Sequence, residues 1–225
     1  MDSIKDDLEI RVKEIDEYLD LLEFIDNSGG FLLDDEANDF LPSVLLKNTM
    51  TGAVKLLLYS LIESIMRESI SAIHDQINDD EVSYDDLRSE IKKEIIRRAK
   101  NNSVGLERLI VDISPSISAS IAAATFRSKN LFSGNIDRGE IKKMSEIYGF
   151  STNSTYSETK HGSQLEPIKN HRNDLAHGNV SFSEVGRNYS VPEIRELAKT
   201  VIAYLETMID NIESYIDDQG YLKIA

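Results

Sequence analysis

Two residue types that together can cleave a phosphodiester bond stand five positions apart in the segment NHRNDLAHGN, residues 170–179. Arg172 carries a planar guanidinium whose donors fit phosphate oxygens. His177 can exchange a proton near neutral pH, as a general acid or base must. The same residues also fit an ordinary helix end, because a histidine followed by a glycine is a common way to close a helix. The spacing alone leaves both interpretations open.

The geometry of a helix limits how these side chains can cooperate. Pro167 in a first turn and Gly178 just past the end predict a helix that begins near Gln164. Asn173 and His177 then share a face, whereas Arg172 lies about 140° around the axis from His177. The helix dipole at this end favours the imidazolium form of histidine. Within one chain, Arg172 and His177 are therefore expected to diverge, while Ile168 and Leu175 point to the core.

Spacings of three and four between apolar residues predict that helices position this segment. Two such stripes are expected to face the core: Leu8, Val12, Ile15, Leu19 and Leu22 near the start, and Leu197, Val201, Leu205, Ile209 and Ile212 near the end. Period-two patterns typical of strands are nearly absent, so we predict an all-α fold, an antiparallel helical bundle. Residues 1–225 are expected to form a single domain, in which helix 2–25 could be an accessory element for dimer or partner contact. Residues 106–126 contain Pro115 and predict two short helices or a broken one. Polar residues 151–163 are expected to form a loop. The other predicted helices span residues 2–25, 48–77, 83–100, 138–148 and 191–216.

Composition and charge narrow the classes of protein. The 225 residues carry a formal net charge of −15, which repels nucleic acid at long range unless the binding cleft is locally basic. We expect Lys169, Arg172 and Arg187 to supply that local charge. Cysteine is absent, which removes disulfides and thiolate zinc sites. No run of about 18 uncharged apolar residues and no apolar export signal are evident. A cytoplasmic protein without a membrane partner is expected.

A resemblance to a known family adds to this interpretation. RNDLAHG at 172–178 resembles the Arg-x4–6-His motif of the HEPN superfamily, a group of all-α proteins that includes many ribonucleases. The similarity extends over residues 132–150 and 172–216, which resemble a branch of HEPN-like nucleases. LLLYSLIESIM, on the long helix predicted at 48–77, is similar to an earlier core helix of that branch.

The resemblance implies a homodimer whose facing motif helices build one cleft from two arginines and two histidines. It implies metal-independent cleavage of RNA, in which the 2′-hydroxyl attacks phosphorus and leaves a 2′,3′-cyclic phosphate. His177 is then the general base or acid, Arg172 stabilises the phosphorane, and Asn173 orients His177 or the phosphate. Neither a cofactor nor a metal ion is expected. Such nucleases act in toxin–antitoxin and antiphage systems, so an antitoxin or sensor protein is an expected partner.

Several other residues are candidates for parts of a site. Glu63 and Arg67 have the spacing of a helical ion pair, and the resemblance makes Glu63 a candidate to border the cleft. Asp174 could orient a partner, although a solvated charge is the favoured interpretation. His171 is expected at the surface. No metal-ligand spacing surrounds the remaining histidines, His74 and His161. In GNID, residues 134–137, the asparagine or the aspartate is expected to cap the next helix.

Two other functions compete with the nuclease. A HEPN-like domain could bind nucleotide or a protein partner without cleaving RNA. A purely structural dimerisation domain, in which the polar motif only closes a helix, fits the same residues. The position of the motif helices relative to a subunit interface and the charge of the cleft separate these alternatives.

Overall fold

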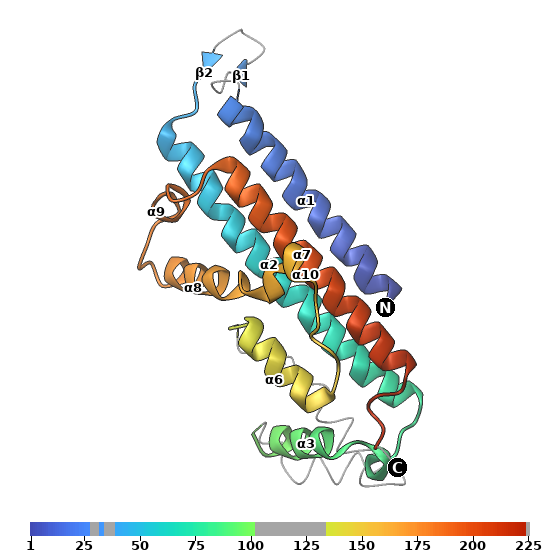
Figure 1. The fold of residues 1–225 in the computed structure, drawn as a ribbon. Coiled ribbons are helices and arrows are strands. Elements are labelled where there is room, and N and C mark those ends of the chain that lie inside the picture. The colour runs from blue at the N-terminus through green and yellow to red at the C-terminus, as the bar shows by residue number, and fades with distance from the viewer. Residues whose placement is uncertain (28–31, 34–38, 102–133, 224–225) are drawn as a thin grey trace.

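Three long helices form the body of the protein (Figure 1). The structure is a computed structural model and describes residues 1–27, 32–33, 39–101 and 134–223. Helix α1 spans Asp2–Asn27, α2 spans Val44–Asp79 and α10 spans Val191–Asp217. Each packs against the other two. In Figure 1, α2 and α10 run in the same direction and α1 runs in the opposite one. The predicted all-α fold class is confirmed, and the described strands are limited to a two-residue pair, Leu32–Leu33 (β1) with Asp39–Phe40 (β2).

Helix α2 is the central element of the core. It begins at Val44, four residues before the predicted start, because the side chain of Ser43 accepts a hydrogen bond from the Leu46 N–H. Most of its apolar side chains are fully buried. By length and composition alone, α2 is long and apolar enough to span a membrane, with a mean hydropathy of 1.2 over its most apolar window. However, 56% of that window is buried inside the protein, as in the core helix of a folded domain.

The amphipathic stripes predicted for α1 and α10 face this core. On α10, the buried residues include all five that were predicted, Leu197, Val201, Leu205, Ile209 and Ile212. On α1, four of the five predicted residues are buried, and Val12 is half-buried. A capping box between Ser190 and Glu193 starts α10, with a proline in its first turn.

The helix predicted at residues 83–100 is interrupted. A 3₁₀ turn, Tyr84–Asp86 (η1), is followed by extended backbone at Leu87, and α3 spans Ser89–Asn101. Leu87 pairs with Leu222 in an isolated antiparallel bridge, and the Arg88 N–H donates to the Tyr221 carbonyl at 3.0 Å. The prediction is confirmed from Ser89 onward and wrong before it, where a contact with the far end of the chain overrides the local preference for helix.

Shorter helices follow in the second half. Helix α6 spans Arg138–Tyr148 as predicted, capped by Asp137 and closed by Gly149. The helices predicted at 106–126 lie outside the described residues. The predicted loop 151–163 instead contains α7, Tyr156–Thr159, and the 3₁₀ turn η2, Lys160–Gly162. Helix α8 spans Leu165–Ala176 and α9 spans Phe182–Gly186.

Helix α9 had no counterpart among the predicted elements. It begins with a capping box formed by Ser181 and Glu184 and packs closely on the first half of α2. A Cβ at Gly52 would lie 2.1 Å from the Phe182 carbonyl oxygen, and one at Gly186 would lie 1.8 Å from the Asn48 carbonyl oxygen. Glycine at both positions allows the backbones of α2 and α9 to come into contact. This contact holds α9, and with it the segment that follows α8, against α2.

Candidate active site

The motif helix α8 lies across α2 in Figure 1 and contacts it. Its ends agree with the prediction, since His177 is the last residue in helical conformation and Gly178 follows with φ +70°. Leu165 and Ile168 are buried, which fixes the face that α8 turns to the core. Leu175, predicted to join them, is only half-buried because it lies in the last turn.

Arg172 is held in place by neutral groups. Its guanidinium lies 5.0 Å from the centroid of the Tyr59 ring, and Nη1 donates to the Asn173 side-chain oxygen at 2.9 Å. Asn173 in turn donates to the Asn135 side-chain oxygen at 2.8 Å. No carboxylate among the described residues forms an ion pair with Arg172. The guanidinium is therefore oriented while its charge stays free to meet a phosphate.

Tyr59 connects Arg172 with α2 and with the segment before α6. It is 2% exposed, and its hydroxyl accepts a hydrogen bond from the Ile136 N–H at 3.3 Å. Burial raises the pKa of Tyr59, and the negative charge of Glu63 raises it further. The hydrogen bond from the Ile136 N–H and the positive charge of Arg172 lower it by less. The phenol therefore stays neutral. Sequence reasoning missed this residue.

Glu63 lies one helical turn beyond Tyr59 and forms the predicted ion pair with Arg67. Both the Glu63 carboxylate and Arg172 influence the pKa of the Tyr59 phenol. That Glu63 borders the cleft stays a prediction. The Glu63 carboxylate is paired with Arg67 and is therefore not available to neutralise Arg172.

Asp137 and Lys169 join α6 to α8. The Lys169 ammonium lies 2.5 Å from a carboxylate oxygen of Asp137, and the other oxygen accepts the Glu140 N–H that starts α6. The expectation that Lys169 makes the cleft basic is therefore wrong, since its partner neutralises it. Arg187 is exposed at the end of α9, and no described contact connects it with Arg172.

A buried lysine supplies the charge that Lys169 does not. Lys55 is 1% exposed on α2, and its ammonium lies 4.0 Å from the centroid of the Tyr189 ring. Burial lowers the pKa of Lys55 to about 8. Lys55 precedes Tyr59 by one helical turn, so Lys55, Tyr59 and Glu63 form a polar line along α2 beneath α8. The i, i+4 spacing of these residues on a mostly apolar helix is the signal that could have identified them.

His171 belongs to this buried region. It was expected at the surface, but it is half-buried, with its ring 6.3 Å from the Tyr189 ring in an edge-to-face arrangement. Burial lowers the pKa of His171, and the neighbouring Lys55 ammonium lowers it further. A neutral imidazole beside Lys55 avoids placing two positive charges together.

His177 is exposed at the end of α8. Its backbone N–H donates to the Asn173 carbonyl at 3.0 Å. Asn173 therefore contacts both residues: its main chain binds His177 and its side chain binds Arg172. Within the described part of the chain, no hydrogen bond joins Arg172 to His177. Asp174, favoured as a solvated charge, is half-buried and accepts a hydrogen bond from the Asn179 side chain at 3.2 Å.

The two remaining histidines lie in other surroundings. His74 is 2% exposed, and its Nε2 lies 2.6 Å from the Tyr148 hydroxyl. His161 belongs to η2, away from α8. In the described ranges, no three histidine or carboxylate side chains gather as a metal ion would need. That these histidines bind no metal stays a prediction.

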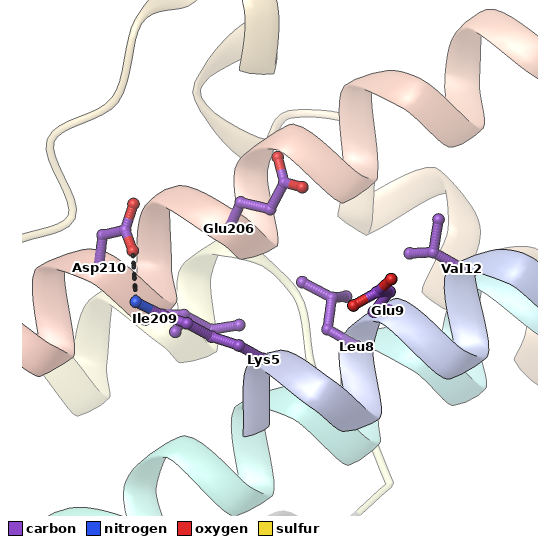
Figure 2. Close-up of a pocket in the computed structure, with 7 residues that line it drawn as sticks. All are labelled: Lys5, Leu8, Glu9, Val12, Glu206, Ile209 and Asp210. Carbon is purple, nitrogen blue, oxygen red and sulfur yellow. Dashed lines mark ion pairs between the residues drawn. The ribbon is translucent and has the colours of Figure 1, made fainter. Parts of the chain in front are cut away.

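A separate cavity of about 470 Å³ lies between α1 and α10 (Figure 2). Leu8, Val12 and Ile209 form its apolar part, and Glu9, Glu206 and Asp210 bring three carboxylates to it. The Lys5 ammonium is 3.4 Å from Asp210, which leaves the lining negative on balance. Burial and the neighbouring Asp210 raise the pKa of Glu206. This charge does not suit a phosphate, so the cavity is not a part of the candidate active site.

Comparison with known protein families identifies the family of this chain. A family model described as HEPN_MAE_28990:/-like HEPN matches residues 1–221. No curated protein and no solved structure matches the chain. The match covers α8 with its Arg172 and His177, and α2 beneath it.

Proposed function

Since the chain belongs to the HEPN superfamily, as predicted, we propose that it is a metal-independent endoribonuclease with Arg172 and His177 as its active pair. The observation that carries this proposal is the state of Arg172. Its guanidinium is oriented by an aromatic ring and an amide, with no described carboxylate to neutralise it. A purely structural arginine in a chain of net charge −15 would be expected to pair with one of the many acids.

The charges near Arg172 determine what can hold a phosphate. Around α8, the pairs of Lys169 with Asp137 and of Arg67 with Glu63 each sum to zero. Of the remaining charged groups, Arg172 and Lys55 are positive, whereas Asp174 and Glu166, in the first turn of α8, are negative. Phosphate binding is therefore supported by Arg172 itself, which no described carboxylate neutralises, and not by a net positive charge.

The proposed reaction is transfer within the RNA backbone. The 2′-oxygen attacks the adjacent phosphorus, the bond from phosphorus to the 5′-oxygen breaks, and the products end in a 2′,3′-cyclic phosphate and a 5′-hydroxyl. His177, paired with the Arg172 of the other subunit, removes the proton from the 2′-hydroxyl as general base, and the imidazolium or water returns a proton to the leaving 5′-oxygen. Arg172 donates hydrogen bonds to the phosphorane oxygens as their charge increases.

A second copy of the chain would complete this site. Arg172 and His177 are not joined within one chain, and two motif helices that face each other would bring the arginine of one subunit to the histidine of the other. Leu56 and Leu57, next to Lys55 on α2, are 40% and 37% exposed and offer apolar surface for such a contact. The proposal therefore includes a homodimer.

The cellular setting is inferred from the family resemblance. We place the nuclease in the cytoplasm, in a toxin or antiphage system, with RNA as substrate and an antitoxin or sensor protein as its regulator. If the protein does not cleave RNA, the non-catalytic binding module becomes the preferred function.

The test is expression of the wild type, His177→Ala and Arg172→Ala in bacteria, followed by analysis of RNA ends. Wild-type protein should yield 2′,3′-cyclic phosphate ends, which both variants lack. Arg11→Ala is a matched control, because Arg11 is a surface arginine paired with Asp7 on α1. Intact RNA with folded wild-type protein, or cyclic ends of equal abundance with His177→Ala, would overturn the proposal.

A further inference from the structure

The groove between α1 and α10 is bridged by a basic residue at each end. Near the start of α1, the Lys5 ammonium lies 2.6 Å from the Glu213 carboxylate of α10. Near the end of α1, the Arg195 guanidinium of α10 lies 2.6 Å from Asp20 and 3.0 Å from Glu23. One cation on one helix thus meets carboxylates of the facing helix at both ends of the groove.

The cavity of about 470 Å³ between these two ends has carboxylates but no such bridge. Glu9 on α1 and Glu206 on α10 line it from its two sides (Figure 2). Within the described part of the chain, neither carboxylate forms an ion pair. Lys5, the cation of the lining, is engaged with Glu213 and Asp210. Burial and the neighbouring Asp210 raise the pKa of Glu206, so a positive charge placed beside this carboxylate would be favourable.

The floor of the cavity is apolar. Leu8 and Ile209 are buried in the core beneath it, and Val12 is half-buried beside them. An apolar floor inside a charged rim is the usual arrangement where an amphipathic helix of a partner lies in a groove. A metal ion or a small cation would use the carboxylates alone. A basic side chain flanked by apolar side chains would use both the rim and the floor.

The charge of α1 determines which partner this groove attracts. Helix α1 carries ten acidic and three basic residues, within a chain of net charge −15. Such a surface steers a basic partner toward the groove and raises its rate of association. A second copy of the chain brings the same acidic helix and the same net charge, so its approach is opposed by repulsion. Charge complementarity therefore favours a basic segment of another protein over self-association.

We propose that the groove between α1 and α10 is the docking site for a basic amphipathic helix of another protein, in which an arginine stands between apolar residues. The arginine lies between Glu9 and Glu206 and supplies the bridge that the middle of the groove lacks. Its planar fork of donors can bind both carboxylates, which a lysine ammonium does less well. Apolar side chains three or four positions away pack on Leu8, Val12 and Ile209. This contact goes beyond RNA cleavage and does not rest on it, since no residue of α8 lines the groove.

The test is fluorescence anisotropy of the full chain with a synthetic helical peptide of about four turns. The peptide carries one arginine, with leucines one turn before and one turn after it. A second peptide has citrulline in place of the arginine, which keeps the shape and removes the charge. Glu9→Gln/Glu206→Gln removes both carboxylates of the groove. Glu14→Gln/Glu17→Gln is the matched control, because it removes two exposed carboxylates from α1 that do not line the cavity. Circular dichroism verifies the fold of each variant.

We expect the arginine peptide to bind wild-type protein, and the citrulline peptide and Glu9→Gln/Glu206→Gln each to weaken binding by about 5- to 30-fold. The control Glu14→Gln/Glu17→Gln should stay within about twofold of wild type, since it changes only the long-range attraction. Absence of binding up to about 1 mM peptide, or equal losses in the two double variants, would overturn the proposal. Sedimentation velocity tests the other occupant. Self-association of the wild type that Glu9→Gln/Glu206→Gln abolishes would assign the groove to a second copy and also overturn it. RNA is absent from both measurements, so their outcome is independent of the proposed nuclease.

Discussion

The ion pair between Asp137 and Lys169 gives the sharpest stability test of the structure around Arg172. The two side chains are 19% and 18% exposed, so solvent screens their attraction only weakly. Asp137 also caps α6, a role that asparagine can keep. Asp137→Asn therefore removes the charge alone, whereas Asp137→Ala removes the charge and the cap.

We expect Asp137→Asn to lower the free energy of unfolding by about 1.5 to 3 kcal/mol, the range for a hydrogen bond to a charged group. Asp137→Ala should cost about 1 kcal/mol more, the usual value of an N-cap. Each 1 kcal/mol corresponds to about 2 to 4 °C in Tm for a chain of this size. Urea unfolding followed by circular dichroism measures these differences.

The pH dependence provides a second readout. Burial alone would raise the pKa of Asp137, but Lys169 and the Glu140 N–H hold it below its usual value. A carboxylate with a lowered pKa stabilises the protein above the unfolded pKa of about 4, and this advantage disappears as pH falls through the lower native value. The difference between wild type and Asp137→Asn should therefore be full at pH 7 and shrink below about pH 4.

A double-mutant cycle with Lys169→Met separates the pair from its surroundings. The free energy of unfolding should fall less in the combined variant Asp137→Asn/Lys169→Met than the two single substitutions predict when added, by at least about 1 kcal/mol. Equal stability of wild type and Asp137→Asn at pH 7, or strict additivity of the two substitutions, would refute the assignment of this pair as the link between α6 and α8.

Three further substitutions test other contacts. Tyr59→Leu removes the ring beneath Arg172, worth about 0.5 to 2 kcal/mol, so RNA cleavage under single-turnover conditions should slow by about 2- to 30-fold, and Tyr59→Phe should stay near wild type. Gly162→Ala places a Cβ 2.7 Å from the Tyr204 ring at φ +70° and should cost about 2 to 4 kcal/mol in thermal unfolding, and an unchanged Tm would contradict this. Lys55→Met should raise the free energy of unfolding at pH 7 by about 1 to 3 kcal/mol, because lowering of the lysine pKa from 10.5 to about 8 penalises the fold. That gain should shrink between pH 8 and 10.5, where the unfolded state holds a proton that the native state has lost, and a less stable Lys55→Met at pH 7 would count against it.

The long helices could be predicted from sequence because periodic apolar residues and local caps suffice to determine them. The ends of α6, α8 and α10 agree with the residues chosen as caps and stops. Elements that depend on distant contacts could not be predicted. Leu87 leaves the helix to pair with Leu222, and the five-residue helix α9 depends on glycine contacts with α2.

The candidate site divides in the same way. Arg172 and His177 could be identified because their residue types and a resemblance point to chemistry. Tyr59 and Lys55 were not identified, because they lie on a helix that is apolar enough to be interpreted as core throughout. The pairing of Lys169 with Asp137 crosses 32 positions of sequence, which no local pattern reveals. The expectation of a locally basic cleft therefore stays a prediction.

Complementation between two inactive variants tests the central claim most directly. Purified Arg172→Ala and His177→Ala chains, each inactive alone, would be mixed under conditions that exchange subunits, and RNA cleavage measured. In a site that joins the arginine of one subunit to the histidine of the other, the mixed dimer contains one intact pair, so cleavage should return to a substantial fraction of wild type. Mixed dimers that form, as shown by mass spectrometry, and still leave RNA intact would contradict the composite site.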